Sequence, residues 1–131
     1  MNTDSPLDDR GLPEGYPFKE DSEILPRDAC ARLEAGDGFV LIDCREDDEL
    51  KVVRVEGAMH CPLGKLMNEI EDVADDLPAG LDTPVAIICH TGRRSLMATL
   101  ALRQMGFRDI RSVAGGIDLW ARDIDPTLER Y

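Results

Sequence analysis

The sequence predicts a three-layer α/β domain, with a mostly parallel central sheet of about five strands and helices on both of its faces. Two observations lead to this fold class. Short apolar segments alternate along the chain with segments of helical periodicity, which is typical of β-α units. The segments at 39–42 and 85–88 are unbroken apolar runs, as expected for strands covered on both faces. The 131 residues suit one domain with one core.

Local signals set the elements of the first half. Pro26 can begin a helix because its fixed φ suits a first turn, and Gly36 follows the end of that helix. Pro62 stops a brief strand, and Pro78 ends a segment with apolar residues at helical spacing. The expected elements are a helix at 26–35, a strand at 39–42, a short helical turn at 46–52, a brief strand at 58–61 and a helix at 63–77.

The second half continues the alternation. Gly106 stands where a left-handed residue ends a helix, and Phe107 can make the apolar contact that accompanies it. Gly115 and Gly116 then turn the chain into its last apolar segment. We expect a strand at 85–88, a helix at 95–105 and a strand at 110–113, followed by the apolar segment at 117–120.

The first twenty residues differ from the rest. They are acidic and contain Pro6, Pro13 and Pro17 among Asp, Glu and Gly. This composition predicts an acidic leader at 1–20 that lies on the surface or is disordered, followed by a single domain at 21–131. We expect Tyr16 and Phe18 to anchor part of the leader to that domain.

Charge and composition exclude several functional classes. The net charge is −12, and no basic patch that could bind nucleic acid is visible. No apolar run approaches the roughly 18 residues of a membrane span, and the N-terminal residues do not resemble a secretory signal. We therefore expect a cytoplasmic protein with no nucleic-acid or membrane partner. The cysteine spacing contains no zinc knuckle, so we expect no metal and no cofactor, and we expect reduced thiols.

The most informative segment is the loop that follows the strand at 85–88. Cys89 comes directly after that strand, and a helix is expected to begin at Ser95. Ligands bind at this edge of open α/β sheets, and helix N-termini favour anions. A thiol in this position should ionise easily, so we predict that Cys89 is the nucleophile of an anion-binding loop. The candidate loop residues are His90, Thr91, Gly92, Arg93, Arg94 and Ser95.

Within the loop the residues differ in their expected tasks. Gly92 permits a tight turn. We expect Arg94 to fold inward and support the loop, and Arg93 or His90 to face the solvent and a substrate. The two arginines together could supply the local positive field that an anionic substrate needs in a protein of this charge.

The length of the loop separates two chemistries. Four residues stand between Cys89 and Arg94, whereas cysteine phosphatases of the tyrosine-phosphatase kind need five before their arginine. Ser95 occupies that position here and cannot form a bidentate clamp on phosphate. The tighter loop favours a sulfur atom carried on the cysteine, and a phosphatase or arsenate reductase remains the less favoured alternative.

The segment from about Glu23 to Trp120 resembles the rhodanese-like family of single-domain sulfurtransferases. Five motifs occur in the order found in that family. They are 41–46 (Leu-Ile-Asp-Cys-Arg-Glu), Gly57-Ala58 followed by Pro62, 89–95 (Cys-His-Thr-Gly-Arg-Arg-Ser), Gly106-Phe107 and 115–120 (Gly-Gly-Ile-Asp-Leu-Trp). The segment at 125–131 is also similar to tails of rhodanese domains that are associated with sulfur-carrier activation.

The resemblance implies a two-step sulfur relay. The Cys89 thiolate would take a sulfane sulfur from a small anionic donor, such as thiosulfate, or from a persulfide, and would pass it to a thiol, to cyanide or to a protein acceptor. Proteins of sulfur-carrier activation are candidate partners. Asp43 and Arg45 would support the site, more through hydrogen bonds that fix the loop than as catalytic groups.

Other interpretations stay open. Cys44 and Cys61 stand near strand ends, where they could resolve a persulfide or disulfide, although small apolar filler is the favoured reading of both. The acidic residues at 46–49 are expected to be a solvated helix start. A rhodanese-like module that only docks another protein is the main alternative to an enzyme, and loss of the active-loop cysteine would be its usual mark.

Overall fold

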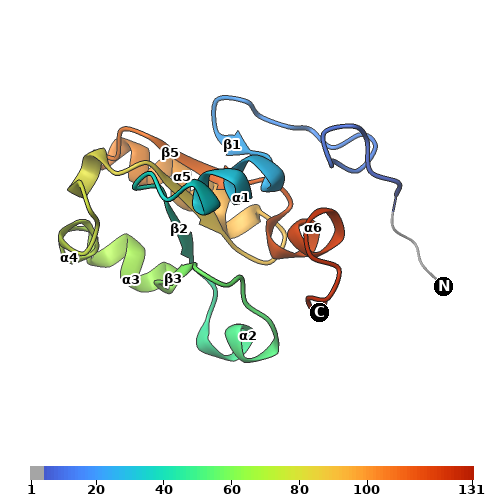
Figure 1. Cartoon of the computed structure of the whole chain (residues 1–131). Coiled ribbons are helices and arrows are strands. Elements are labelled where there is room, and N and C mark those ends of the chain that lie inside the picture. The colour runs from blue at the N-terminus through green and yellow to red at the C-terminus, as the bar shows by residue number, and fades with distance from the viewer. Residues whose placement is uncertain (1–4) are drawn as a thin grey trace.

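Five parallel strands form one sheet in the order β1-β5-β4-β2-β3 (Figure 1). The structure is a computed structural model that describes residues 5–131. The strands are short, and β4 lies at the centre of the sheet with β2 and β5 beside it. Their bounds are β1 Glu23–Ile24, β2 Val40–Asp43, β3 Met59–His60, β4 Val85–Ile88 and β5 Ile110–Val113. Every pairing is parallel, so the sequence correctly predicted the sheet of about five strands.

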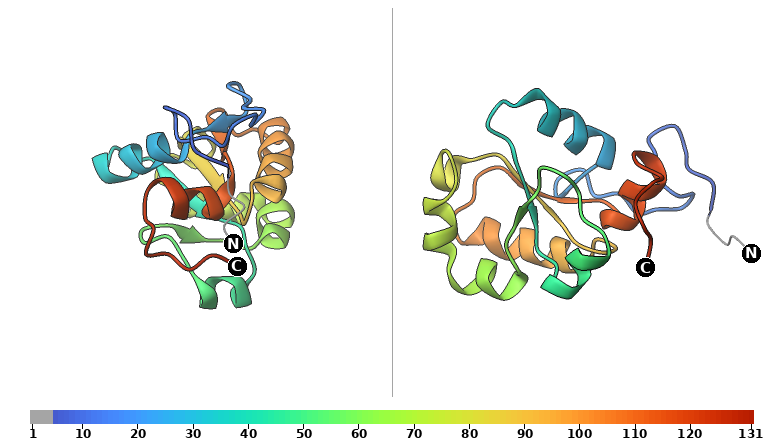
Figure 2. Two further views of the ribbon diagram at one scale, coloured as in Figure 1. Left: turned by 90° about the vertical axis from the view of Figure 1, so that its right-hand side faces the viewer. Right: turned by 60° about the horizontal axis from the view of Figure 1, so that its bottom comes forward.

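Helices cover both faces of this sheet, as Figure 2 shows in two views. On one face, α1 (Pro26–Ala35) and α6 (Gly116–Asp123) enclose a core that includes Leu41 and Trp120. On the other face, α3 (Leu63–Asn68), α4 (Ile70–Asp75) and α5 (Arg93–Gln104) enclose a second core. The short helix α2 (Asp47–Val52) follows β2, and a 3-10 turn, η1 (Gly80–Asp82), precedes β4. The two-sided covering explains why β4 is buried along its whole length.

The helix expected at 63–77 is divided in two. Glu69 lies between α3 and α4 with φ −127° and ψ 44°, outside the helical region. Leu66 and Val73 still reach the core, as their helical spacing predicts. The apolar spacing therefore identified the buried face, but it contained no signal for the break.

The edge strand β1 was not expected from the sequence. It has only two residues, too few for any periodicity. Buried Glu23 is held there because its carboxylate accepts hydrogen bonds from the Tyr16 hydroxyl, at 2.6 Å, and from the Lys19 backbone N–H, at 2.9 Å.

Residues 5–20 of the expected leader pack against the domain. Leu12 is fully buried in a small core with Ala114 and Leu119, and Tyr16 and Phe18 pack against it. Over these residues the chain lies on the surface of the domain with Tyr16 and Phe18 among its contacts, which is one of the two alternatives expected for the leader. Residues 1–4 of the leader lie outside the described residues.

Candidate active site

Cys89 is the first residue after β4 and lies at the carboxyl edge of the sheet. Its Sγ accepts hydrogen bonds from the backbone N–H of Gly92, at 3.1 Å, and of Ser95, at 3.3 Å. The Ser95 hydroxyl lies 3.3 Å from the same sulfur and 2.6 Å from the Ser112 hydroxyl. The loop and the first turn of α5 therefore direct their donors at one sulfur atom.

These contacts favour the thiolate. The pKa of Cys89 is lowered to about 5, first by a hydrogen bond from the Cys44 thiol and then by the Ser95 hydroxyl and the two backbone N–H groups. Burial opposes the shift, since only 1% of Cys89 is exposed. The hydrogen bonds outweigh this desolvation, so Cys89 is ionised at neutral pH.

Cys44 lies beside Cys89 and is completely buried in the apolar core, which agrees with the favoured reading of it as small filler. It follows β2, which is the neighbour of β4, and its backbone N–H donates to Ile88 O at 3.0 Å. The hydrogen bond to Cys89 and burial raise the pKa of Cys44 far above its usual range, so it remains a thiol. The available signal was positional: Cys44 and Cys89 each directly follow a strand, and the carboxyl ends of parallel strands meet at one edge.

The first turn of α6 supports the active loop from behind. Ile117 N–H donates to Cys89 O at 2.8 Å, and Asp118 N–H donates to His90 O at 3.1 Å. Gly116 has φ +62°, and a Cβ there would lie 2.4 Å from Cys89 O. Gly92, with φ +101°, makes the turn of the loop itself. Because Gly92 and Gly116 have no side chains, the backbone of the active loop can pack closely against the backbone at the start of α6.

The two loop arginines separate in the structure. Arg94 forms a bidentate ion pair with Glu49 of α2, with N–O distances of 2.6 and 2.8 Å. This pairing lowers the pKa of Glu49 to about 2. Arg94 thus supports the loop from α2, and its charge is neutralised there. Arg93, by contrast, is exposed, and among residues 5–131 it has no ion-pair partner.

Glu49 and Tyr131 are site residues that the sequence did not identify. The Tyr131 hydroxyl donates to Glu49 Oε2 at 2.7 Å, and its ring stacks on His90. His90 is half-buried beneath that ring, while Thr91 is exposed at the tip of the loop. Glu49 was grouped with the solvated acidic run, and no local pattern distinguishes it from its neighbours.

Asp43 and Arg45 form a buried ion pair beside the loop. Arg45 Nη2 donates to Asp43 Oδ2 and to Val53 O, each at 2.7 Å, and both side chains are almost completely buried. Arg45 Nη1 donates to the Tyr131 hydroxyl at 3.1 Å. The pair ties the end of β2 to the far end of α2, and so fixes the position of Glu49.

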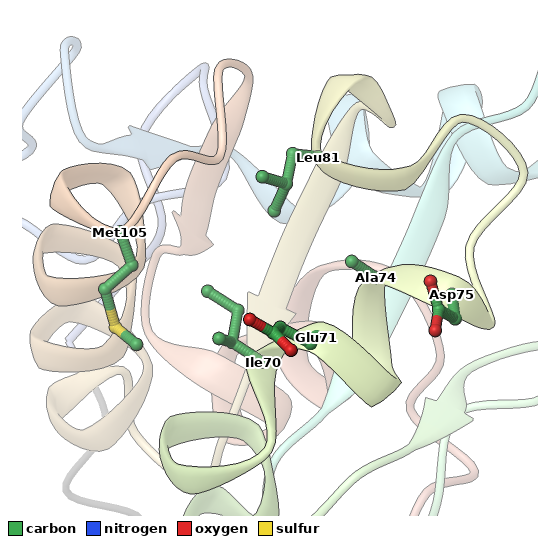
Figure 3. Close-up of a pocket in the computed structure, with 6 residues that line it drawn as sticks. All are labelled: Ile70, Glu71, Ala74, Asp75, Leu81 and Met105. Atoms are coloured by element: carbon green, nitrogen blue, oxygen red, sulfur yellow. The ribbon is translucent and has the colours of Figure 1, made fainter.

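A separate pocket of about 400 Å³ lies away from this site, between α4, η1 and the end of α5 (Figure 3). Its lining includes Ile70, Leu81 and Met105. About 18 Å of helix, at 1.5 Å per residue, separates Met105 from the start of α5 beside Cys89.

Across residues 5–131, no cluster of His, Cys, Asp or Glu is arranged to hold a metal ion. No helix in the described part of the chain is long and apolar enough to cross a membrane.

The fold and the site define an α/β protein with a buried cysteine whose sulfur accepts backbone hydrogen bonds in the loop after β4. A family model for the Rhodanese-like domain matches residues 26–123. The chain therefore belongs to the rhodanese-like family, as its motifs predicted.

Known relatives agree with this assignment. The probable adenylyltransferase/sulfurtransferase MoeZ of Mycobacterium tuberculosis is 36% identical over 110 residues, which cover 84% of this chain and 27% of the relative. Adenylyltransferase and sulfurtransferase MOCS3-1 of Zea mays is 26% identical over 130 residues, which cover 98% and 28%. The chain thus spans about a quarter of the length of these relatives, and it is homologous to one part of each.

Solved structures show the same fold. A rhodanese-related protein of Thermoplasma volcanium is 28% identical, with a TM-score of 0.66 over 82% of this chain and 99% of that chain. The human single-domain sulfurtransferase TSTD1 is 21% identical, with a TM-score of 0.65 over 76% and 95%. The second likeness concerns the fold alone.

Proposed function

We propose that this protein is a sulfurtransferase that relays a sulfane sulfur through a persulfide on Cys89. The observation that carries the proposal is the convergence of the Gly92 and Ser95 backbone N–H groups on Cys89 Sγ, at 3.1 and 3.3 Å. Donors preorganised around one sulfur stabilise a thiolate before the reaction and an anionic persulfide after it. Because the pKa of Cys89 is about 5, the thiolate that acts as the nucleophile is present at neutral pH.

The reaction would proceed in two displacements. The Cys89 thiolate attacks the outer sulfur of thiosulfate, the S–S bond of the donor breaks, and sulfite leaves with the electron pair. A thiophilic acceptor then attacks the outer sulfur of the persulfide, and the Cys89 thiolate leaves. Because each step exchanges one S–S bond for another or for an acceptor–sulfur bond, a difficult transfer is divided into two easier ones.

The charges around the loop bear on the donor and the acceptor. Arg93 is exposed at the start of α5, where its charge can attract a small anion toward the loop. The names of several relatives combine adenylyltransferase and sulfurtransferase, and a relative in Bacillus subtilis is a putative sulfur carrier protein. These names support the proposal that a protein of sulfur-carrier activation accepts the sulfur from Cys89.

Intact-mass spectrometry of reduced, desalted protein tests the proposal. After incubation with thiosulfate, mercaptopyruvate or a low-molecular-weight persulfide, the protein should gain one sulfur, which cyanide should remove. Cys89→Ala should gain none. Cys30→Ala is the matched control, because Cys30 lies on α1 and its thiol donates to Glu34, away from the loop.

Two results would contradict the proposal. A gain of sulfur by Cys89→Ala would place the carrier elsewhere. If none of the three donors modified Cys89, a docking module would become the better interpretation, while hydrolysis of an aryl phosphate would favour phosphatase chemistry.

A further inference from the structure

Three cysteines lie in a row along the carboxyl edge of the sheet. Asp43 of β2 pairs with Ile88 of β4 on one side and with His60 of β3 on the other. The next residue of each strand is a cysteine, so Cys44 lies between Cys89 and Cys61. All three belong to the same apolar core, on the face covered by α3, α4 and α5.

Cys44 and Cys89 are placed to react with each other. They follow paired residues of adjacent strands, Asp43 and Ile88, so their side chains lie on the same face of the sheet and in the same apolar core. Neighbouring strands are about 4.8 Å apart, which falls within the Cα separation of about 4.4–6.8 Å that disulfides span. The backbone of Cys44 is anchored on both sides, by its N–H to Ile88 O and by its carbonyl to Leu63 N–H, each at 3.0 Å.

Burial limits the partners of Cys44. It is completely buried, and 1% of Cys89 is exposed. Cys44 is therefore shielded from reagents in solution, and the neighbouring sulfur of Cys89 is a partner that it can meet without leaving the core.

Resting on the proposed sulfur relay, we propose that Cys44 is a resolving cysteine for the Cys89 persulfide. When no acceptor removes the outer sulfur, Cys44 attacks Cys89 Sγ, and a Cys44–Cys89 disulfide forms as hydrosulfide leaves.

The step balances without an external oxidant. The Cys44 proton moves to the outer sulfur, the bond between Sγ and the outer sulfur breaks, and its electron pair leaves with HS⁻. The two cysteine sulfurs are oxidised to a disulfide, and the sulfane sulfur is reduced to sulfide. A dithiol reductant then returns both thiols and ends as its own disulfide. Cys44 thus discharges a persulfide that finds no acceptor.

The experiment follows loaded protein over time under anaerobic conditions, so that oxygen is not an oxidant. The protein is loaded with thiosulfate or a low-molecular-weight persulfide at mildly alkaline pH and rapidly desalted. Intact mass without reductant and released sulfide are then measured together. The variants are Cys44→Ser, which keeps the size of the side chain, Cys44→Val, which keeps it apolar, and Cys61→Ala as the control on the other side of Cys44.

We expect wild type and Cys61→Ala to gain one sulfur and then to become two hydrogens lighter than reduced protein, with release of one sulfide. Peptide mapping should locate the disulfide between Cys44 and Cys89. In both Cys44 variants the persulfide should last at least about tenfold longer, because the adjacent nucleophile is gone.

The outcomes separate the two proposals. The resolving role of Cys44 is wrong if the wild-type persulfide lasts as long as that of the Cys44 variants, or if wild type and both Cys44 variants release sulfide at the same rate. Either result leaves the proposed sulfur relay through Cys89 unaffected. If neither wild type nor the Cys44 variants gain sulfur from any donor, the relay is wrong and the resolving role falls with it.

Discussion

The ring of Tyr131 stacks on the imidazole of His90, with centroids 3.9 Å apart and planes 10° from parallel. The contact joins a residue of the active loop to the segment that follows α6. Through its hydroxyl, Tyr131 also reaches Glu49, which holds Arg94. One aromatic side chain therefore links the loop, the helix α2 and the start of α5.

Replacing Tyr131 should loosen the active loop. Tyr131→Ala removes both the stacking and the hydroxyl, whereas Tyr131→Phe keeps the ring. Because an aromatic pair contributes about 0.5–1.5 kcal/mol, we expect the alanine variant to be less stable than the phenylalanine variant by about that amount. Urea denaturation measures this difference, and amide hydrogen exchange at residues 90–92 should be faster in Tyr131→Ala. Equal exchange in the two variants would show that stacking does not restrain the loop.

The thiolate of Cys89 should depend on Cys44. The pKa of Cys89 is about 5, and the hydrogen bond from Cys44 is the largest cause. Cys44→Val removes that donor, so the pKa should rise by about one unit or more. The ultraviolet absorbance of the thiolate, followed against pH and corrected with Cys89→Ala, reports the midpoint. Cys61→Ala should leave the midpoint in place, and an unchanged midpoint in Cys44→Val would contradict the assignment.

The Glu49–Arg94 ion pair should stabilise the protein at neutral pH. The pKa of Glu49 in the folded protein is about 2, below its ordinary value of 4.5. A depressed carboxyl pKa contributes stability above the unfolded value, and this stability is lost as pH falls through the folded value. Glu49→Gln should therefore lower the free energy of unfolding by about 1 kcal/mol at neutral pH and by little near pH 2.

The same variant should alter donor binding. Glu49→Gln releases the charge of Arg94 beside the loop, so KM for thiosulfate should fall if thiosulfate is the donor. Asp48→Asn is the matched control, because Asp48 lies on the same helix and is exposed.

For the stability prediction, a loss of stability in Glu49→Gln that does not change with pH would indicate that Glu49 stabilises the protein through packing rather than through its charge.

The Asp43–Arg45 pair should be structural. Arg45→Met leaves the Asp43 carboxylate buried without its partner, which should cost about 3–5 kcal/mol of stability. Denaturant unfolding measures the loss. At low temperature, the molecules that remain folded should still load one sulfur on Cys89, as seen by intact mass. If folded Arg45→Met protein failed to load sulfur on Cys89, the Asp43–Arg45 ion pair would instead take part in the sulfur transfer.

Local patterns determined much of this protein. The apolar runs before Asp43 and Cys89 predicted the central strands, and Pro26 and Gly36 set the bounds of α1. The loop from Cys89 to Ser95 could be predicted as a site because strand, turn and helix start are all local features of the sequence. The order of the motifs also identified the family, which the family match confirmed.

The tertiary structure decided the partners of these residues. Cys44 meets Cys89 only through the register of two strands, Glu49 meets Arg94 across 45 residues, and Tyr131 meets His90 across 41. Such contacts depend on long-range packing, and no local periodicity encodes them. The sequence by itself therefore determined the fold and the position of the proposed nucleophile, while only the assembled sheet decided which side chains set its pKa and surround its sulfur.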